Sequence, residues 1–170
     1  AHPDPDIRRW IVRLAGDKTS VSENLAEAFR NTAEIEPNVD VRSQLAASAK
    51  RLSAKHGLPI LQALAMRNED LEDKHLPLMI WWGIEAHAET GRDQIHEWFS
   101  KPKTWDLPIF SQILGQRLMR RYAMAGGEAN FNSCADLLES APTEEEKRTL
   151  MMGLQLAFQG TTIPLSLIHI

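Results

Sequence analysis

The sequence is poor in cysteine and in long apolar runs. Cys134 is the single cysteine of the 170-residue chain, so an internal disulfide and a four-cysteine metal site are excluded, while the redox compartment stays open. No apolar run approaches the roughly 18 residues that a membrane-spanning helix needs, and we expect no membrane span. The start, AHPDPDIRRW, carries neither an initiator Met nor a signal-peptide pattern, which favours a fragment of a larger protein.

Excess basic charge is also missing. The formal net charge is −4, so the chain has no global basic field that would hold nucleic acid, and we expect protein partners or neighbouring domains instead. The content of 43% hydrophobic and 25% charged residues is ordinary for a globular protein. A chain of this length buries roughly 70% of its unfolded surface when compact, as one domain or as a run of small repeats.

The familiar catalytic signatures are absent too. The sequence has no Gly-x-Ser-x-Gly elbow and no Gly-rich phosphate loop. Cys134 lacks the partner cysteine and the following histidine that covalent haem attachment requires. We therefore expect a chain that is not an enzyme and that binds no cofactor of its own.

What the sequence does contain is a weak internal repeat. The motif DIR at residues 6–8 recurs 34 positions later as DVR at residues 40–42, each with a proline shortly before it. A weaker third copy, DKH at residues 73–75, follows 33 positions later and aligns Leu78 with Leu45. Self-similarity at such a period is typical of stacked helical repeats.

Each copy has the local chemistry of a helix start. Proline and an acidic residue before the helix supply a fixed φ and an acceptor for unpaired N–H groups. Apolar residues then follow at helical spacing: Ile7, Ile11 and Leu14; Val41, Leu45 and Ala49; Leu78, Trp81 and Trp82.

Second helices lie between these copies. Ser20 with Glu23, and Thr143 with Glu146, have the spacing of capping boxes, and Gly126-Gly127 is a helix stop. No convincing strand pattern occurs. The sequence therefore predicts an all-α fold, an α-solenoid of HEAT-like helical hairpins with a period of about 33–34 residues over residues 1–160.

A cluster of acidic residues and histidines resembles a metal site at first sight. Glu85 and Glu89 share a helix face, but His87 points about 200° away from Glu85, so one helix cannot bring all three to a metal. His96 lies beyond Gly91 without a fixed spacing. We expect ordinary polar residues and no metal site here. An all-α metalloenzyme built around His87, His96 and Glu85 is the least favoured alternative.

The tryptophans have a packing interpretation. Trp81 and Trp82 diverge by about 100° on a helix, so one is expected to face the core and the other the next repeat rather than a sugar, haem or peptide. Trp10, Trp98 and Trp105 are expected to lie in similar contacts.

One basic face is the most site-like surface feature. Arg117, Arg120 and Arg121 fall at i, i+3 and i+4 of a helix, with Tyr122 beside them. Such a face suits a docking surface for an acidic partner or a phosphate. The alternatives are a solvated face or pairing with glutamates of a neighbouring helix.

Several stretches together resemble the HEAT-like region of large exported planctomycete-type proteins, the membrane-bound dehydrogenase domain proteins with a haem-binding C-terminus. The resemblance runs from about Pro3 to Gly160 and rests on these stretches: DPDIRRWIVRLAGD, VRSQLAASAKRL, LPILQALAMRNED, HLPLMIWWGIEAHA and LMRRYAMAGG with CADLLESAP. In that family an N-terminal β-propeller precedes helical repeats and a c-type cytochrome domain. The resemblance implies a connecting solenoid in an exported or periplasmic protein, with haem c in the parent protein. No catalytic residue transfers, because propeller strands and a Cys-x-x-Cys-His motif are missing from this chain.

The last ten residues, TTIPLSLIHI at 161–170, lose the helical period. Residues 165–170 have the sequence that a common transposon-based sequencing adapter encodes in one frame, so we expect a non-native or disordered tail. The alternative is a genuine exposed apolar tail.

The favoured function is a non-catalytic scaffold that connects and docks domains of a larger redox protein. The alternative is a stand-alone protein-binding or peptide-binding module with its docking site around Arg120. Because the terminal repeats lack polar caps, exposed apolar surface is expected at both ends.

Overall fold

Residues 2–159 are described by a computed structural model, and every regular element among them is helical. The all-α prediction is therefore confirmed for this part of the chain. A 3₁₀ turn at Asn68–Asp70 and a π-helix at Ile109–Leu114 accompany the α-helices. The ten α-helices are α1 (Pro5–Ala15), α2 (Glu23–Ile35), α3 (Val39–Ala49), α4 (Ala54–Ala65), α5 (Leu76–Ala86), α6 (Arg92–Phe99), α7 (Pro102–Trp105), α8 (Gly115–Ala125), α9 (Glu128–Ser140) and α10 (Glu144–Phe158). The tail predicted at 161–170 lies outside the described residues.

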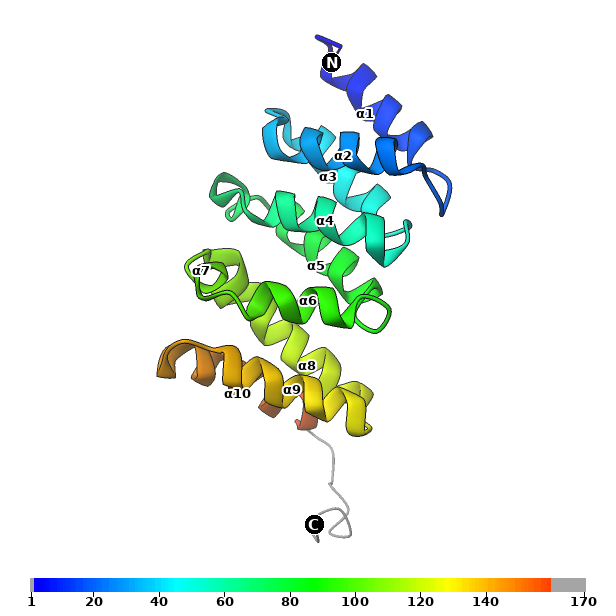
Figure 1. Ribbon diagram of the computed structural model, residues 1–170. Coiled ribbons are helices and arrows are strands. Elements are labelled where there is room, and N and C mark those ends of the chain that lie inside the picture. The colour runs from blue at the N-terminus through cyan, green and yellow to red at the C-terminus, as the bar shows by residue number, and fades with distance from the viewer. Residues whose placement is uncertain (1, 160–170) are drawn as a thin grey trace, which may run out of the picture.

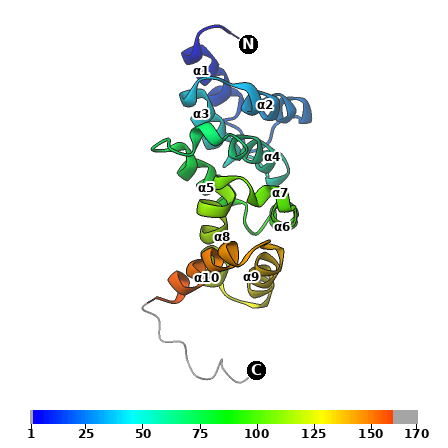
Figure 2. The same ribbon diagram turned by 90° about the vertical axis from the view of Figure 1, so that its left-hand side faces the viewer.

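The helices form two columns. Figures 1 and 2 show α1, α3, α5, α8 and α10 in one column and α2, α4, α6 and α9 in the other, with α1 at one end and α9 and α10 at the opposite end. Within the first column α1 packs on α3, α3 on α5, and α8 on α10. In the second column α2 packs on α4, and α6 on α9. The helices also pack across the two columns, α3 on α4 and α8 on α9, so the apolar faces are buried against neighbours in both columns.

The starts of two helices in the first column, α1 and α3, are capped alike. Asp4 and Asn38 accept hydrogen bonds from the N–H groups two residues later, at 2.8 and 3.0 Å. Ahead of α5, Asp73 accepts from the His75 and Leu76 N–H groups at 2.9 and 2.8 Å, but His75, the residue just before α5, makes no capping bond with its side chain. A side-chain acceptor at this position satisfies an N–H group that has no partner within the helix.

Two of the predicted helix boundaries are confirmed and one is wrong. Thr143 caps α10 by accepting from the Glu145 N–H at 3.2 Å, and α8 ends where Gly126 takes a φ of 65°. The cap of α2 is Ser22 rather than Ser20, because it is the Ser22 hydroxyl that accepts from the Leu25 N–H, at 3.3 Å.

Burial follows the repeated pattern, with a correction to its register. Val41 and Leu45 of α3 are fully buried, and so are Leu76 and Ile80 of α5. This burial pattern places Ile80, not Leu78, at the position of Leu45, an offset of 35 residues instead of the predicted 33. Leu78 itself is only partly buried.

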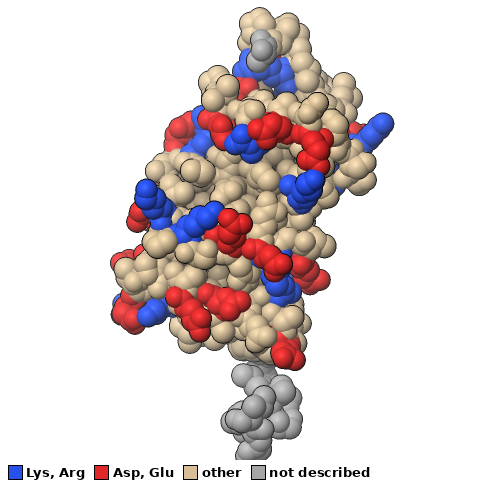
Figure 3. Space-filling model, viewed as in Figure 1, with Lys and Arg blue, Asp and Glu red and all other residues tan. Residues whose placement is uncertain are grey.

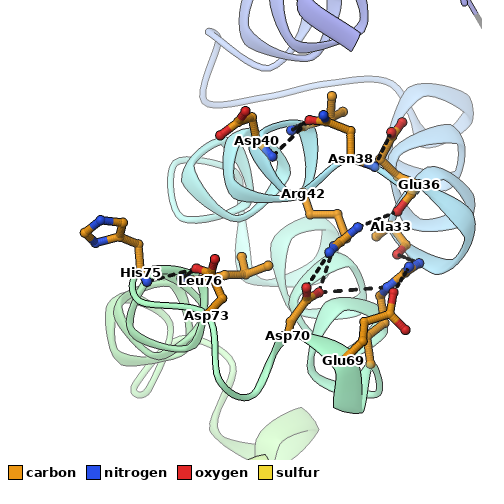
Figure 4. Close-up of polar contacts among 12 residues, drawn as sticks. Ala33, Glu36, Asn38, Asp40, Arg42, Glu69, Asp70, Asp73, His75 and Leu76 are labelled. Carbon is orange, nitrogen blue, oxygen red and sulfur yellow. Dashed lines mark hydrogen bonds and ion pairs between the residues drawn. The ribbon is translucent and has the colours of Figure 1, made fainter.

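Two arginine–carboxylate pairs join α1 and α3 to the turns that follow α2 and α4, and Figure 4 shows the second of them, between Arg42 and Asp70. Arg8 donates to Glu36 at 2.6 and 2.9 Å, and Arg42 donates from Nε to Asp70 at 2.7 Å and from a terminal nitrogen to its other oxygen. Each pair spans 28 residues. Burial raises the pKa of Glu36, but the bonds from Arg8 and from the Asn38 N–H outweigh it and hold that pKa below its usual value.

The tryptophans divide into two groups. Trp81, Trp98 and Trp105 are buried, and the indole N–H of Trp105 donates to the Phe99 carbonyl at 2.8 Å. The packing prediction is wrong for Trp10 and Trp82, whose exposed fractions are 51% and 49%. No helix within residues 2–159 covers these two side chains, because each lies on the outward face of its helix.

Exposed apolar surface at both ends is confirmed. Eight of the twelve exposed large apolar side chains within residues 2–159 lie on the terminal helices α1, α9 and α10. They are Ile7, Trp10, Ile11, Leu14, Phe131, Met151, Met152 and Leu156.

Candidate docking surface

A hollow of about 520 Å³ opens on the molecular surface between α5 and α8. Its lining combines guanidinium groups with aromatic and thioether side chains, and we call it the α5–α8 hollow. The residues that line it are Trp81, Trp82, Glu85, Arg117, Arg120, Arg121, Met124 and Ala125.

The arginines of helix α8 point outward because the opposite face of the helix is buried in the core. Leu118 and Met119 are fully buried, so Arg117 and Arg120, one turn apart, are turned toward solvent at the rim of the hollow. No ion pair or hydrogen bond joins either guanidinium group to another residue of the described chain. Arg121 differs, because it pairs with Glu89 at 3.1 Å and is 28% exposed.

The structure corrects the placement of Tyr122, which was predicted beside this basic face. Tyr122 is fully buried, and its hydroxyl donates to the Ala88 carbonyl at 3.0 Å. Burial raises its pKa to about 12, although the nearby charges of Arg92 and Arg121 oppose the shift. Tyr122 therefore fixes α8 against the end of α5 and takes no part in the docking surface.

Two residues that the sequence did not assign to this surface complete it. Trp82 is half exposed, and Met124, at 62% exposure, lies on the α8 side of the same hollow. Helical geometry predicted that the Trp81 and Trp82 rings would diverge, but it placed the second ring against the next repeat and not on an exposed surface. The sequence held no signal that this ring would lie beside Arg117 and Arg120.

This lining can bind an anionic group next to an apolar one. A guanidinium group binds carboxylates through charge-assisted hydrogen bonds, and unpaired arginines are free to do so. An indole face and a thioether contribute large, adaptable apolar contacts. The lining carries one negative charge, on Glu85, and three positive charges, on the arginines. The hollow therefore repels a cationic partner.

Glu85, His87 and Glu89, the cluster that resembled a metal site in the sequence, do not converge in the structure. The His87 Nε2 lies 3.0 Å from the Ala49 carbonyl oxygen in the core, whereas Glu89 binds Arg121 on the surface. Burial lowers the pKa of His96, which lies against the Tyr122 ring, despite the opposing charge of Asp136. Within residues 2–159 no group of three or more His, Cys, Asp or Glu side chains is placed to hold a metal ion. His87, His96 and Glu85 are thus not gathered into one site.

The helices described for residues 2–159 are each too short or too polar to cross a membrane. A scan against protein-family models, a search of curated proteins and a search of solved structures found no match to this chain.

Proposed function

We propose that the chain is a docking scaffold, an α-solenoid of HEAT-like helical hairpins whose α5–α8 hollow binds an acidic segment of a partner protein or neighbouring domain. The recurrence of a cap and of an arginine–carboxylate pair at a spacing of 34 residues, and of buried positions at a spacing of 35, supports the repeat architecture. Repeats of this kind present rigid surfaces for protein binding.

The observation that carries the binding proposal is the state of Arg117 and Arg120. Both are exposed at the rim of one hollow, and neither is paired with a carboxylate of the described chain. The other interpretation of this face, neutralisation by glutamates of a neighbouring helix, applies only to Arg121. Two free guanidinium groups beside Trp82 favour a segment with two carboxylates next to an aromatic or aliphatic side chain.

The experiment is a titration monitored by fluorescence anisotropy. The probe is a labelled peptide in which two glutamates flank a leucine, and the reference peptide has glutamines in their place. We expect the glutamate peptide alone to bind, with an affinity that falls as salt is added, because the contacts at the rim are electrostatic. Arg117→Glu with Arg120→Glu should weaken binding about tenfold or more, since two attractive contacts become repulsive.

The matched control changes the net charge by the same amount elsewhere. Lys18 and Lys103 are both exposed and lie outside the α5–α8 hollow, so Lys18→Glu with Lys103→Glu should leave the affinity nearly unchanged. Equal losses in the two double variants would show that the peptide responds to net charge alone. Equal binding of the glutamate and glutamine peptides would leave the hollow as solvated surface.

We also propose that this scaffold is one segment of a larger, exported redox protein, as the family resemblance implies, and that it contributes neither catalysis nor a cofactor of its own. A stand-alone binding module is the alternative. The coding sequence on either side distinguishes them. Propeller blades before the chain and a Cys-x-x-Cys-His motif after it support the first, and immediately flanking start and stop codons support the second.

A further inference from the structure

A second hollow, of about 640 Å³, opens between the end of α4 and the connection from α6 to α8, and we call it the α4–α7 hollow. Most of its lining surface is apolar: Met66 follows α4, and Pro102, Leu107 and Phe110 belong to the connection. Figure 1 shows α7 on the side of the stack where α4 ends. The volume is within the range of about 300–1,000 Å³ that small-molecule sites occupy.

The hollow arises from a departure from the repeat. One repeat earlier, Arg67, two residues beyond α4, donates to the Ala33 and Glu34 carbonyls at the end of α2, at 3.3 and 2.7 Å. Lys101, two residues beyond α6, instead turns back to Glu97 of α6, at 2.8 Å. Within residues 2–159 no side chain of the connection from α6 to α8 hydrogen-bonds to α4. The space that Arg67 spans in one repeat therefore stays open in the next.

The inner wall of this hollow is fixed by core packing. Phe110 is 1% exposed, and its ring packs edge-to-face on that of Phe99, with the ring centres 5.6 Å apart. Phe110 belongs to the π-helix, a type of turn that is frequent at functional sites. Met66 is 61% exposed, and its flexible thioether can adapt to a ligand. The hollow thus combines a preformed wall with one adaptable side chain.

The charge inside the hollow is positive. Its lining contains Lys101 and Lys103 and no carboxylate. Glu97 neutralises Lys101, whereas the Lys103 ammonium group makes no ion pair or hydrogen bond with another described residue. Figure 3 shows basic and acidic side chains close together over the region of α6 and α7, but Asp106, the acidic residue that follows α7, lies outside the lining. Lys103 is therefore the charge that is available to a ligand.

Two uncharged polar groups accompany this lysine. The Gln62 amide and the Thr104 hydroxyl line the hollow, and neither makes a hydrogen bond with another residue of the described chain. Each of them can donate to a carboxylate oxygen. A largely apolar hollow with a few convergent polar groups is the usual form of a small-molecule site.

We propose that the α4–α7 hollow binds a small amphipathic carboxylate. The apolar body of this ligand lies against Met66, Leu107 and Phe110, and its carboxylate lies at Lys103. Burial of the apolar body supplies most of the affinity, because an exposed ion pair contributes little. No residue lines both hollows, so the proposal does not depend on docking at the α5–α8 hollow.

The test is a titration of the full chain with decanoate, below the concentration at which decanoate forms micelles, followed by NMR of ¹³C-labelled methionine methyl groups. Among the methionines of the described chain, Met66 alone lines the α4–α7 hollow, whereas Met124 lines the α5–α8 hollow and Met151 and Met152 are exposed on α10. We expect the Met66 signal to shift saturably, at concentrations about tenfold or more below those that shift the other three. Butyrate, which has the same carboxylate on a shorter apolar body, should bind about tenfold or more weakly than decanoate.

Variants measured by isothermal titration calorimetry test the two halves of the site. Met66→Glu should weaken decanoate binding about tenfold or more, and Lys103→Glu should weaken it about fivefold. The matched controls Ile35→Glu and Lys18→Glu change an exposed apolar residue and an exposed lysine outside the lining, and they should leave the affinity unchanged. All four residues are exposed, so the fold should tolerate the changes, and circular dichroism checks this.

Parallel shifts of the four methionine signals would overturn the proposal, because they indicate detergent-like binding to any exposed apolar surface. So would the lack of a saturable Met66 shift, or equal affinities of the Met66→Glu and Ile35→Glu variants. An unchanged affinity in Lys103→Glu would overturn the placement of the carboxylate at Lys103.

Discussion

Replacing Asp70 with alanine should lower the free energy of unfolding by about 3–5 kcal/mol, because it leaves the Arg42 guanidinium buried without its counter-ion. The Arg42 and Asp70 side chains are 6% and 4% exposed. Arg42 also donates to the Glu36 carbonyl at 2.9 Å, so the pair ties the end of α2, the start of α3 and the turn before α5 together. The measurement is urea unfolding followed by circular dichroism at neutral pH.

Two further variants show whether the lost charge pairing is the cause. Arg42→Met with Asp70→Leu removes both charges and keeps the volume, and it should recover most of the lost stability. Arg30→Ala breaks pairs with Glu27 and Glu34 on the exposed face of α2 and should cost less than about 1 kcal/mol. A loss below about 1 kcal/mol for Asp70→Ala would contradict the burial of the Arg42–Asp70 pair.

The second large effect is expected from truncating a buried position of the repeat. Leu45→Ala should cost about 2–5 kcal/mol, because the fully buried leucine lies between successive helices of the column and its removal leaves a cavity. Urea unfolding of the variant beside the unaltered chain gives the difference.

The chain contains its own matched control for this prediction. Ile11 holds the same position in α1, 34 residues earlier, but is 54% exposed. Ile11→Ala should therefore change the stability by no more than about 0.5 kcal/mol, and alanine's higher helix propensity further offsets the small apolar loss. Measurements at several protein concentrations check that self-association does not contribute to the difference. Similar losses at both positions would contradict the placement of α1 at an open end.

Local chemistry made much of the fold predictable. Proline and an acidic residue before an apolar run indicated the starts of α1 and α3, and the 34-residue offset between them is the one that the structure shows, although the residue that caps α3 is Asn38. Gly126-Gly127 and Thr143 marked helix boundaries because only particular residues suit a positive φ or an N-cap.

The errors arose where tertiary context decides. The third repeat was placed two residues early because Leu78, which lies near the expected position, is apolar like Ile80, and only burial distinguishes the two. Ser20 and Ser22 are both acceptable caps, and the path of the loop before α2 selects Ser22.

The candidate site was predicted only in part, because tertiary contacts again decide which side chains reach it. Helical spacing alone placed Arg117 and Arg120 on one face. It could not show that Tyr122 turns inward to reach the Ala88 carbonyl, nor that Trp82 comes from a separate helix to join the arginines.

The central claim, a stack of helices in two columns, is tested most directly by small-angle X-ray scattering of the monomer. A compact chain of this length would have a radius of gyration of about 15–16 Å and a symmetric distribution of interatomic distances. The stack predicts a clearly larger radius and a distribution that peaks near the width of two helix layers, roughly 20 Å, with a long tail. A symmetric distribution with a radius near 15 Å would contradict the account.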